Sequence, residues 1–236
     1  MKKFIVDTST ERCRIFLELA GNASVFEDFS EDGIYVFSPA KRFTEEELKA
    51  AGDKTVFAGK IKDAPENYHT VNDDERYLRH ISDITAEGTL AEIITRTRKS
   101  LHGINVLVLG YGRLGKAVTG ILNRVGTEVA VCTYDREEFD TIKTNTAFFG
   151  KSVNPTLSRF DVIVNTVPAE IITESDKVCL TDKNLILDLA SLPCVKYSPG
   201  DGFRYVPLPK MPDVYAPQSA AEFMYDSIKR TICNVT

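Results

Sequence analysis

The chain has 236 residues, of which 43% are hydrophobic and 27% charged, with a formal net charge of −5. This composition predicts a folded globular protein of one large or two small domains, and the acidic balance excludes a general nucleic-acid binder. Five scattered cysteines without CxxC spacing and only three histidines predict neither a disulfide framework nor a metal site. Without an apolar run long enough for a bilayer or a signal peptide, we expect a cytoplasmic protein that contacts no membrane.

A small α/β domain is predicted for residues 1–84. Its strands are expected from three short apolar segments: 4–6, 33–37 and 55–58. Helices are expected over 9–19 and after Thr44, whose hydroxyl and the Glu47 carboxylate have the spacing of a capping box. Alternating strands and helices indicate a parallel sheet. The charged segment 72–80 is interpreted as a solvated helix face.

A connector helix is predicted for residues 85–103, beginning at Thr85 and ending at Gly103. A Rossmann-type doubly wound parallel sheet is then expected over 104–218, and a helix over 219–236 that packs back. Apolar segments predict the strands of this sheet: 106–109, 128–133, 161–165, 184–189 and 203–208. A short helix is expected over 139–145.

The stretch GYGRLG, residues 110–115, follows the first of these strands and opens an amphipathic helix. Gly110 is expected to make the tight turn, Gly112 to let a pyrophosphate approach the backbone, and Gly115 to let the helix pack closely. A glycine motif alone is weak, but the strand before it and the helix and strand after it are the required context. The motif therefore predicts a dinucleotide site.

The choice of nicotinamide cofactor depends on the end of the second strand, where NAD-specific sites place an acid. Thr133 stands there, without a charge to repel a 2′-phosphate, and Arg136 could pair with that phosphate. We therefore expect NADP, with NAD as the alternative if Asp135 becomes the ribose acid or Arg136 is only a solvated loop residue. The expected cofactor-binding residues are Gly110, Gly112, Arg113, Leu114, Gly115, Thr133, Tyr134, Arg136, Thr166, Val167 and Pro168.

Five segments in order give the chain a family resemblance: TAEG at 85–88, HGINVLVLGYGRLG at 102–115, NTVPA at 165–169, LDLAS at 187–191 and MPDVYAPQSAAEF at 211–223. Together they resemble the dipicolinate synthase A subunits, with a shorter region before TAEG. The resemblance implies a two-domain NADP-dependent oxidoreductase that works with a flavoprotein-like B subunit on dihydrodipicolinate. A homo-oligomer is also expected.

The last segment departs from the family's P-G-x-x-A-P-x-T-A-G pattern, because Asp213, Ser219 and Ala221 replace its glycine, threonine and last glycine. The substrate is therefore less certain than the cofactor. A non-catalytic dinucleotide-binding protein that supports or senses for a partner enzyme is the alternative function.

Substrate contacts are expected between the domains, from strand ends and the loop 212–219. The candidates are Ala190, Ser191, Gln218 and Ser219. Glu87, expected to open the connector helix near the cleft, is the candidate general acid or base; it could equally be a helix-start carboxylate that complements the dipole.

Overall fold

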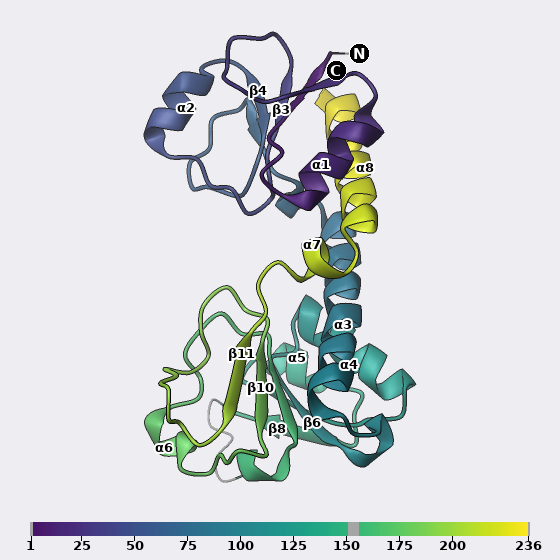
Figure 1. Cartoon of the computed structure of the whole chain (residues 1–236), viewed down its shortest axis with the longest axis vertical. Coiled ribbons are helices and arrows are strands. Elements are labelled where there is room, and N and C mark those ends of the chain that lie inside the picture. The colour runs from purple at the N-terminus through teal and green to yellow at the C-terminus, as the bar shows by residue number, and fades with distance from the viewer. Residues whose placement is uncertain (1, 151–155, 236) are drawn as a thin grey trace. The chain divides into compact units, whose positions relative to one another are not determined.

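The computed structural model describes residues 2–150 and 156–235. The chain divides into two compact units, one formed by residues 1–81 and 212–236 and the other by 82–211 (Figure 1). Both are α/β, each with its own parallel sheet.

The first unit contains a five-stranded sheet of order β2-β1-β3-β4-β5 in which every neighbouring pair is parallel. Its strands are β1 (Phe4–Val6), β2 (Ala23–Val25), β3 (Ile34–Val36), β4 (Thr55–Phe57) and β5 (Tyr68–His69). Its other elements are α1 (Glu11–Ala20), α2 (Glu45–Ala51), η1 (Val71–Asp73), the start of α3 (Glu75–Thr97), α7 (Met211–Tyr215) and α8 (Pro217–Val235). The predicted capping box of Thr44 and Glu47 is present and begins α2.

Successive strand residues in this unit face two different cores, as the two-residue period of a strand requires. Phe4 and Val6 of β1 face one core, which includes Phe16 of α1 and Met224 and Ile228 of α8. Ile5 faces the other core, on the side of α2. The C-terminal helix α8 lies beside α1 (Figure 1), so residues from both ends of the chain complete one core.

Charged groups join the two chain segments of this unit. The Arg12 guanidinium is nearly buried and donates to the Asp213 carboxylate (3.1 and 2.8 Å) and to the Tyr77 hydroxyl (2.6 Å). Asp74 Oδ1 accepts from the backbone N–H groups of Arg76 and Tyr77, which begins helix α3. Its Oδ2 accepts from the Ser227 hydroxyl (2.7 Å) and from Arg230 of α8.

Acid should weaken this unit through Asp74. Burial alone would raise its pKa, but hydrogen bonds from Ser227 and Arg230 lower it from 3.8 to about 2. A carboxyl group whose pKa is lower in the folded state stabilises the fold fully above its unfolded value and loses this contribution as pH falls through the folded value. Asp74→Asn should therefore lower the free energy of unfolding near neutral pH and flatten its decline between about pH 4 and pH 2, measured by urea unfolding across pH. Equal pH profiles for the variant and the wild type would contradict the assignment.

The second unit contains a six-stranded sheet of order β11-β10-β9-β6-β7-β8, again parallel throughout. Its strands are β6 (Asn105–Leu109), β7 (Glu128–Thr133), β8 (Thr146–Phe149), β9 (Val162–Asn165), β10 (Leu185–Asp188) and β11 (Arg204–Pro207). Its helices are the remainder of α3, η2 (Leu101–Gly103), α4 (Arg113–Arg124), α5 (Arg136–Asp140), η3 (Leu157–Arg159) and α6 (Glu174–Lys177). This is the doubly wound Rossmann order, and the predicted α/β fold class is confirmed.

The second sheet is buried on both faces. Val106 and Val108 of β6 face a core that includes Ala86 and Ile93 of α3 and Val118 of α4. Leu107 and Leu109 of β6 face the opposite core, and the same alternation holds in β9 and β10. Helices α3 and α4 lie together over one face (Figure 1). Among the described residues, no helix is long and apolar enough to cross a membrane.

Several predicted boundaries were wrong. Helix α3 begins at Glu75 rather than Thr85 and ends at Thr97 rather than Gly103, because the Asp74 cap starts it within the charged segment. The helix expected over 139–145 lies at Arg136–Asp140, where the Asp135 side chain accepts from the Glu138 N–H and caps it. The expected loop 212–219 is mostly helical, in α7 and the first turn of α8. Three short edge strands, β2, β5 and β8, were not predicted.

Candidate active site

The candidate site lies at the carboxyl edge of the second sheet, where β6 and β9 are neighbours and the connections diverge to opposite sides. Such a switch point is where open α/β sheets bind ligands. Gly110 follows β6 with φ +89°, and a Cβ there would lie 2.6 Å from Thr166 Oγ1 and 2.8 Å from Val167 Cγ2. The Thr166 hydroxyl donates to the Leu109 carbonyl (2.8 Å). Glycine is therefore required both by the backbone conformation and by the neighbouring segment.

Helix α4 begins directly at this turn. Gly112 is its N-cap residue and offers no side-chain cap, so the positive end of the helix dipole faces this turn, as in sites that bind anions. A Cβ at Gly115 would lie 2.2 Å from the Gly110 carbonyl oxygen. At Gly112 the nearest atom to such a Cβ is Glu138 Oε1, at 3.4 Å. The turn thus leaves an open approach to the backbone at Gly112 and none at Gly110 or Gly115.

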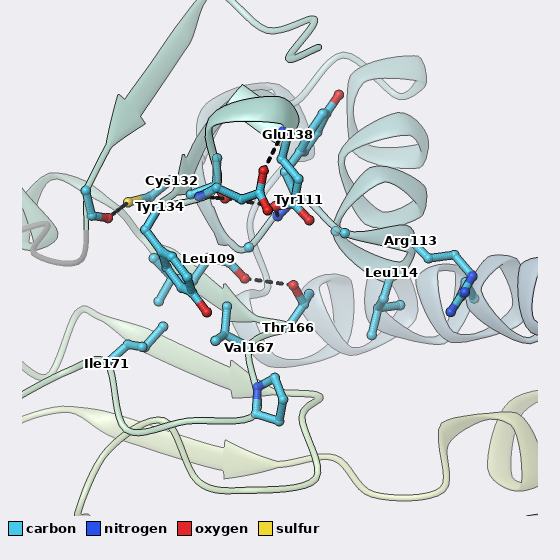
Figure 2. A pocket seen from close by; sticks show the side chains of 18 residues that line it. Leu109, Tyr111, Arg113, Leu114, Cys132, Tyr134, Glu138, Thr166, Val167 and Ile171 are labelled. Carbon is cyan, nitrogen blue, oxygen red and sulfur yellow. Dashed lines mark hydrogen bonds between the residues drawn. The ribbon is translucent and has the colours of Figure 1, made fainter. Parts of the chain in front are cut away.

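A pocket of about 390 Å³ opens over this turn. Every predicted cofactor-binding residue except Arg136 lines it, and Leu109, Cys132, Asp135, Glu138 and Ile171 also contribute. Figure 2 shows Thr166, Val167 and Ile171 on one side of the pocket, and Tyr111 and Glu138 on the other. The glycine cradle and the N-terminal end of α4 fit a dinucleotide pyrophosphate.

Arg136 is turned away from this pocket. Its guanidinium pairs with Asp140 (3.3 Å) and lies over the rings of Phe139 and Phe149.

Glu138 lines the pocket but was not among the site residues predicted from the sequence. Its Oε2 accepts from the Thr133 hydroxyl (2.8 Å) and from the Tyr111 backbone N–H (3.2 Å). The sequence signal for Glu138 is its position three residues after the N-cap Asp135, where an acid folds back toward the start of the helix. That spacing does not indicate the contact with Tyr111.

A buried polar network holds the opposite wall. Asn165 binds the Val167 backbone through both its amide oxygen (3.0 Å) and its amide nitrogen (2.9 Å), and donates to Asp188 Oδ1 (2.8 Å). The other Asp188 oxygen accepts from the Tyr205 hydroxyl and the Cys194 backbone N–H, both at 2.8 Å. Burial, together with the Asp188 carboxylate, raises the pKa of Tyr205 well above its usual value, so this hydroxyl remains a donor. The ends of β9 and β10 are thereby fixed to each other and to Tyr205 of β11.

The remaining predicted site residues lie outside this pocket. Glu87 is exposed and lies within α3 rather than at its start, so it is not a helix-start carboxylate. Its role as a general acid or base stays a prediction. Ala190 and Ser191 follow β10 in the second unit; Gln218 and Ser219 lie in the first turn of α8 in the first unit. The Gln218 amide donates to Glu222 (2.8 Å). Their substrate contacts stay predictions.

The segment that forms the pocket is similar to the NAD-binding domain of a dehydrogenase family. A family model described as the NAD-binding domain of D-isomer specific 2-hydroxyacid dehydrogenase matches residues 75–183, which contain every described residue that lines the pocket. The dipicolinate synthase A subunit of Bacillus subtilis (strain 168) is 28% identical over 156 residues, covering 64% of this chain and 52% of that protein. The match therefore spans about half of the relative's length.

Solved structures agree in fold. The dipicolinate synthase A chain from Bacillus subtilis has a TM-score of 0.83 at 19% identity, covering 99% of this chain and 96% of that one. The dipicolinate synthase A subunit from Bacillus halodurans has a TM-score of 0.78 at 21% identity, covering 97% of each. A transhydrogenase from Sinorhizobium meliloti has a TM-score of 0.72 at 12% identity, covering 98% and 93%.

The chain is similar to the dipicolinate synthase A subunits. The resemblance expected from the sequence is confirmed, and residues 75–183 match a dehydrogenase domain that binds a nicotinamide dinucleotide.

The glycine turn gives a direct test of dinucleotide binding. Gly115→Ala places a methyl group against the Gly110 carbonyl and should lower both stability, by about 1–3 kcal/mol, and dinucleotide affinity. At Gly112 an added Cβ meets only Glu138 Oε1, at 3.4 Å. Gly112→Val should therefore keep the fold and abolish binding, measured by calorimetry alongside thermal unfolding.

Gly120→Ala, on the same helix, is the matched control. A Cβ there meets no atom within 4 Å, so binding should be unchanged and stability should rise by about 0.5–1 kcal/mol from helix propensity. Wild-type affinity in Gly112→Val would show that the pyrophosphate binds elsewhere.

Proposed function

We propose that the chain transfers a hydride between a nicotinamide dinucleotide and a small carboxylate of the dihydrodipicolinate type. The observation that carries the proposal is the glycine-lined pocket at the β6/β9 switch point, within the segment that matches a dehydrogenase NAD-binding domain. The likeness to the dipicolinate synthase A subunits supports the substrate class.

The residues of this chain bind and orient rather than react. The first amides of α4 would hold the pyrophosphate, and Thr166–Pro168, fixed by Asn165, would line the path of the rest of the cofactor. When bound, the nicotinamide ring supplies the hydride acceptor, and oxidation of a dihydropyridine carboxylate then gives one hydride to the ring and releases one proton. Glu87 stays a candidate for that proton, although it does not line the pocket.

The proposal includes a partner protein that works with this chain. The relative's name designates one component of a synthase, and the family resemblance implies a flavoprotein-like B subunit. We propose that this chain works with such a protein and forms a homo-oligomer.

One observation favours the alternative, a non-catalytic dinucleotide-binding protein. In the described part of the chain no histidine or lysine lines the pocket, and its two acidic residues, Asp135 and Glu138, lie at the end of β7. A proton-transfer group would then have to come from elsewhere in the chain or from a partner.

The test follows dihydrodipicolinate-dependent reduction of NAD and NADP, by absorbance of the reduced nicotinamide, with and without the flavoprotein-like partner. Gln218→Ala combined with Ser219→Ala should raise the KM for the carboxylate by about tenfold, since loss of hydrogen bonds to a charged group costs about 1.5–3 kcal/mol. Dinucleotide Kd should be unchanged. Asp226→Ala, an exposed residue of the same helix, is the control.

Dinucleotide binding without turnover, with the flavoprotein-like partner present, would favour the non-catalytic alternative. Absence of any dinucleotide binding would contradict both functions. An unchanged KM in the double variant would remove Gln218 and Ser219 from the substrate site.

A further inference from the structure

Glu138 reaches the glycine turn from helix α5. Its Oε2 joins the last residue of β7, through the Thr133 hydroxyl, to the turn, through the Tyr111 backbone N–H. Figure 2 shows the side chain extending from α5 toward the turn. Within the described residues Oε1 accepts no hydrogen bond, and it lies near Gly112 on the pocket wall. One carboxylate oxygen is therefore held in place and the other is open to a ligand.

The end of the second strand is where a dinucleotide-binding fold contacts the adenosine ribose. In such folds an acid at the end of the second strand accepts hydrogen bonds from the ribose hydroxyls. Here the second strand, β7, ends in Thr133, which has no charge, but the Glu138 carboxylate lies 2.8 Å from the Thr133 hydroxyl oxygen. The acid missing from the strand end is supplied from the helix that follows.

The surrounding charges reinforce this assignment. Asp135 also lines the pocket at the strand end, and its Oδ1 caps α5 by accepting from the Glu138 N–H. Arg136 is held by Asp140 and two aromatic rings outside the pocket. Arg113, the one basic residue of the described chain that lines the pocket, lies on the first turn of α4, away from Glu138 in Figure 2. The end of β7 is thus acidic.

We propose that Glu138 determines cofactor specificity: it accepts a hydrogen bond from the ribose 2′-hydroxyl of NAD(H) and repels the 2′-phosphate of NADP(H). The proposal rests on the dinucleotide binding assigned above and reverses the preference expected from Thr133 and Arg136. That expectation required an uncharged strand end and a free guanidinium. Glu138 supplies a charge beside Thr133, and Arg136 lies outside the pocket with its guanidinium beside Asp140.

The experiment measures Kd for NADH and NADPH by fluorescence with the full chain. The wild type should bind NADH about tenfold or more tightly than NADPH, because like charges within a few ångströms repel strongly in a partly buried site. Glu138→Gln keeps the shape of the side chain and an oxygen for the Tyr111 N–H, and should raise NADPH affinity about tenfold while weakening NADH only slightly. Glu137→Gln removes the same charge one residue away, from an exposed position outside the pocket, and should leave the ratio unchanged.

Salt gives a second readout. Since ions screen repulsion between charges, higher ionic strength should reduce the NADH preference of the wild type and have less effect in Glu138→Gln. Thermal unfolding of both variants checks that the fold is retained.

The outcomes separate this inference from the proposed function. A wild type that prefers NADPH, or a ratio that moves equally in Glu138→Gln and Glu137→Gln, overturns the role of Glu138 and leaves the oxidoreductase assignment standing. Failure of the wild type to bind either dinucleotide overturns both.

Discussion

The close approach of helix α4 to the end of strand β6 is the constraint on which the site depends. No side chain fits between Gly115 and the Gly110 carbonyl, so the helix starts at the sheet edge and its first amides face the pocket. The Thr166 segment closes over Gly110 from the neighbouring strand. Turn, helix start and β9 end therefore form one rigid support, whose geometry tolerates only glycine at two positions.

Rigid walls of this kind need polar groups that are satisfied. Asp188 is 2% exposed, and Asn165, Tyr205 and the Cys194 backbone all donate to it. A buried carboxylate is costly unless it is fully hydrogen-bonded. The network offsets that cost and also fixes the backbone of Val167, so the same bonds that stabilise the sheet edge position the pocket wall.

In the first unit, charged side chains join residues that are far apart in the sequence. Arg12 donates to Asp213 and to Tyr77, and Asp74 accepts from Ser227 and Arg230. Residues early in the chain therefore hold its C-terminal segment. Asp213 stands where the resembled family has glycine. In this chain its carboxylate forms a nearly buried pair with Arg12, which gives the departure a structural role.

The sequence by itself determined the central strands, the face that each residue presents, and the glycine turn, because these depend on local period and on backbone sterics. Val106 and Leu107 face opposite cores for that reason. The edge strands β2, β5 and β8 were not predicted because segments of two to four residues are too short to show a clear period. Only the tertiary structure decided that Arg136 turns to Asp140 and that Glu138 meets Tyr111. Such contacts depend on how a helix is placed against a turn 27 residues earlier in the chain, and residue spacing alone does not encode that placement.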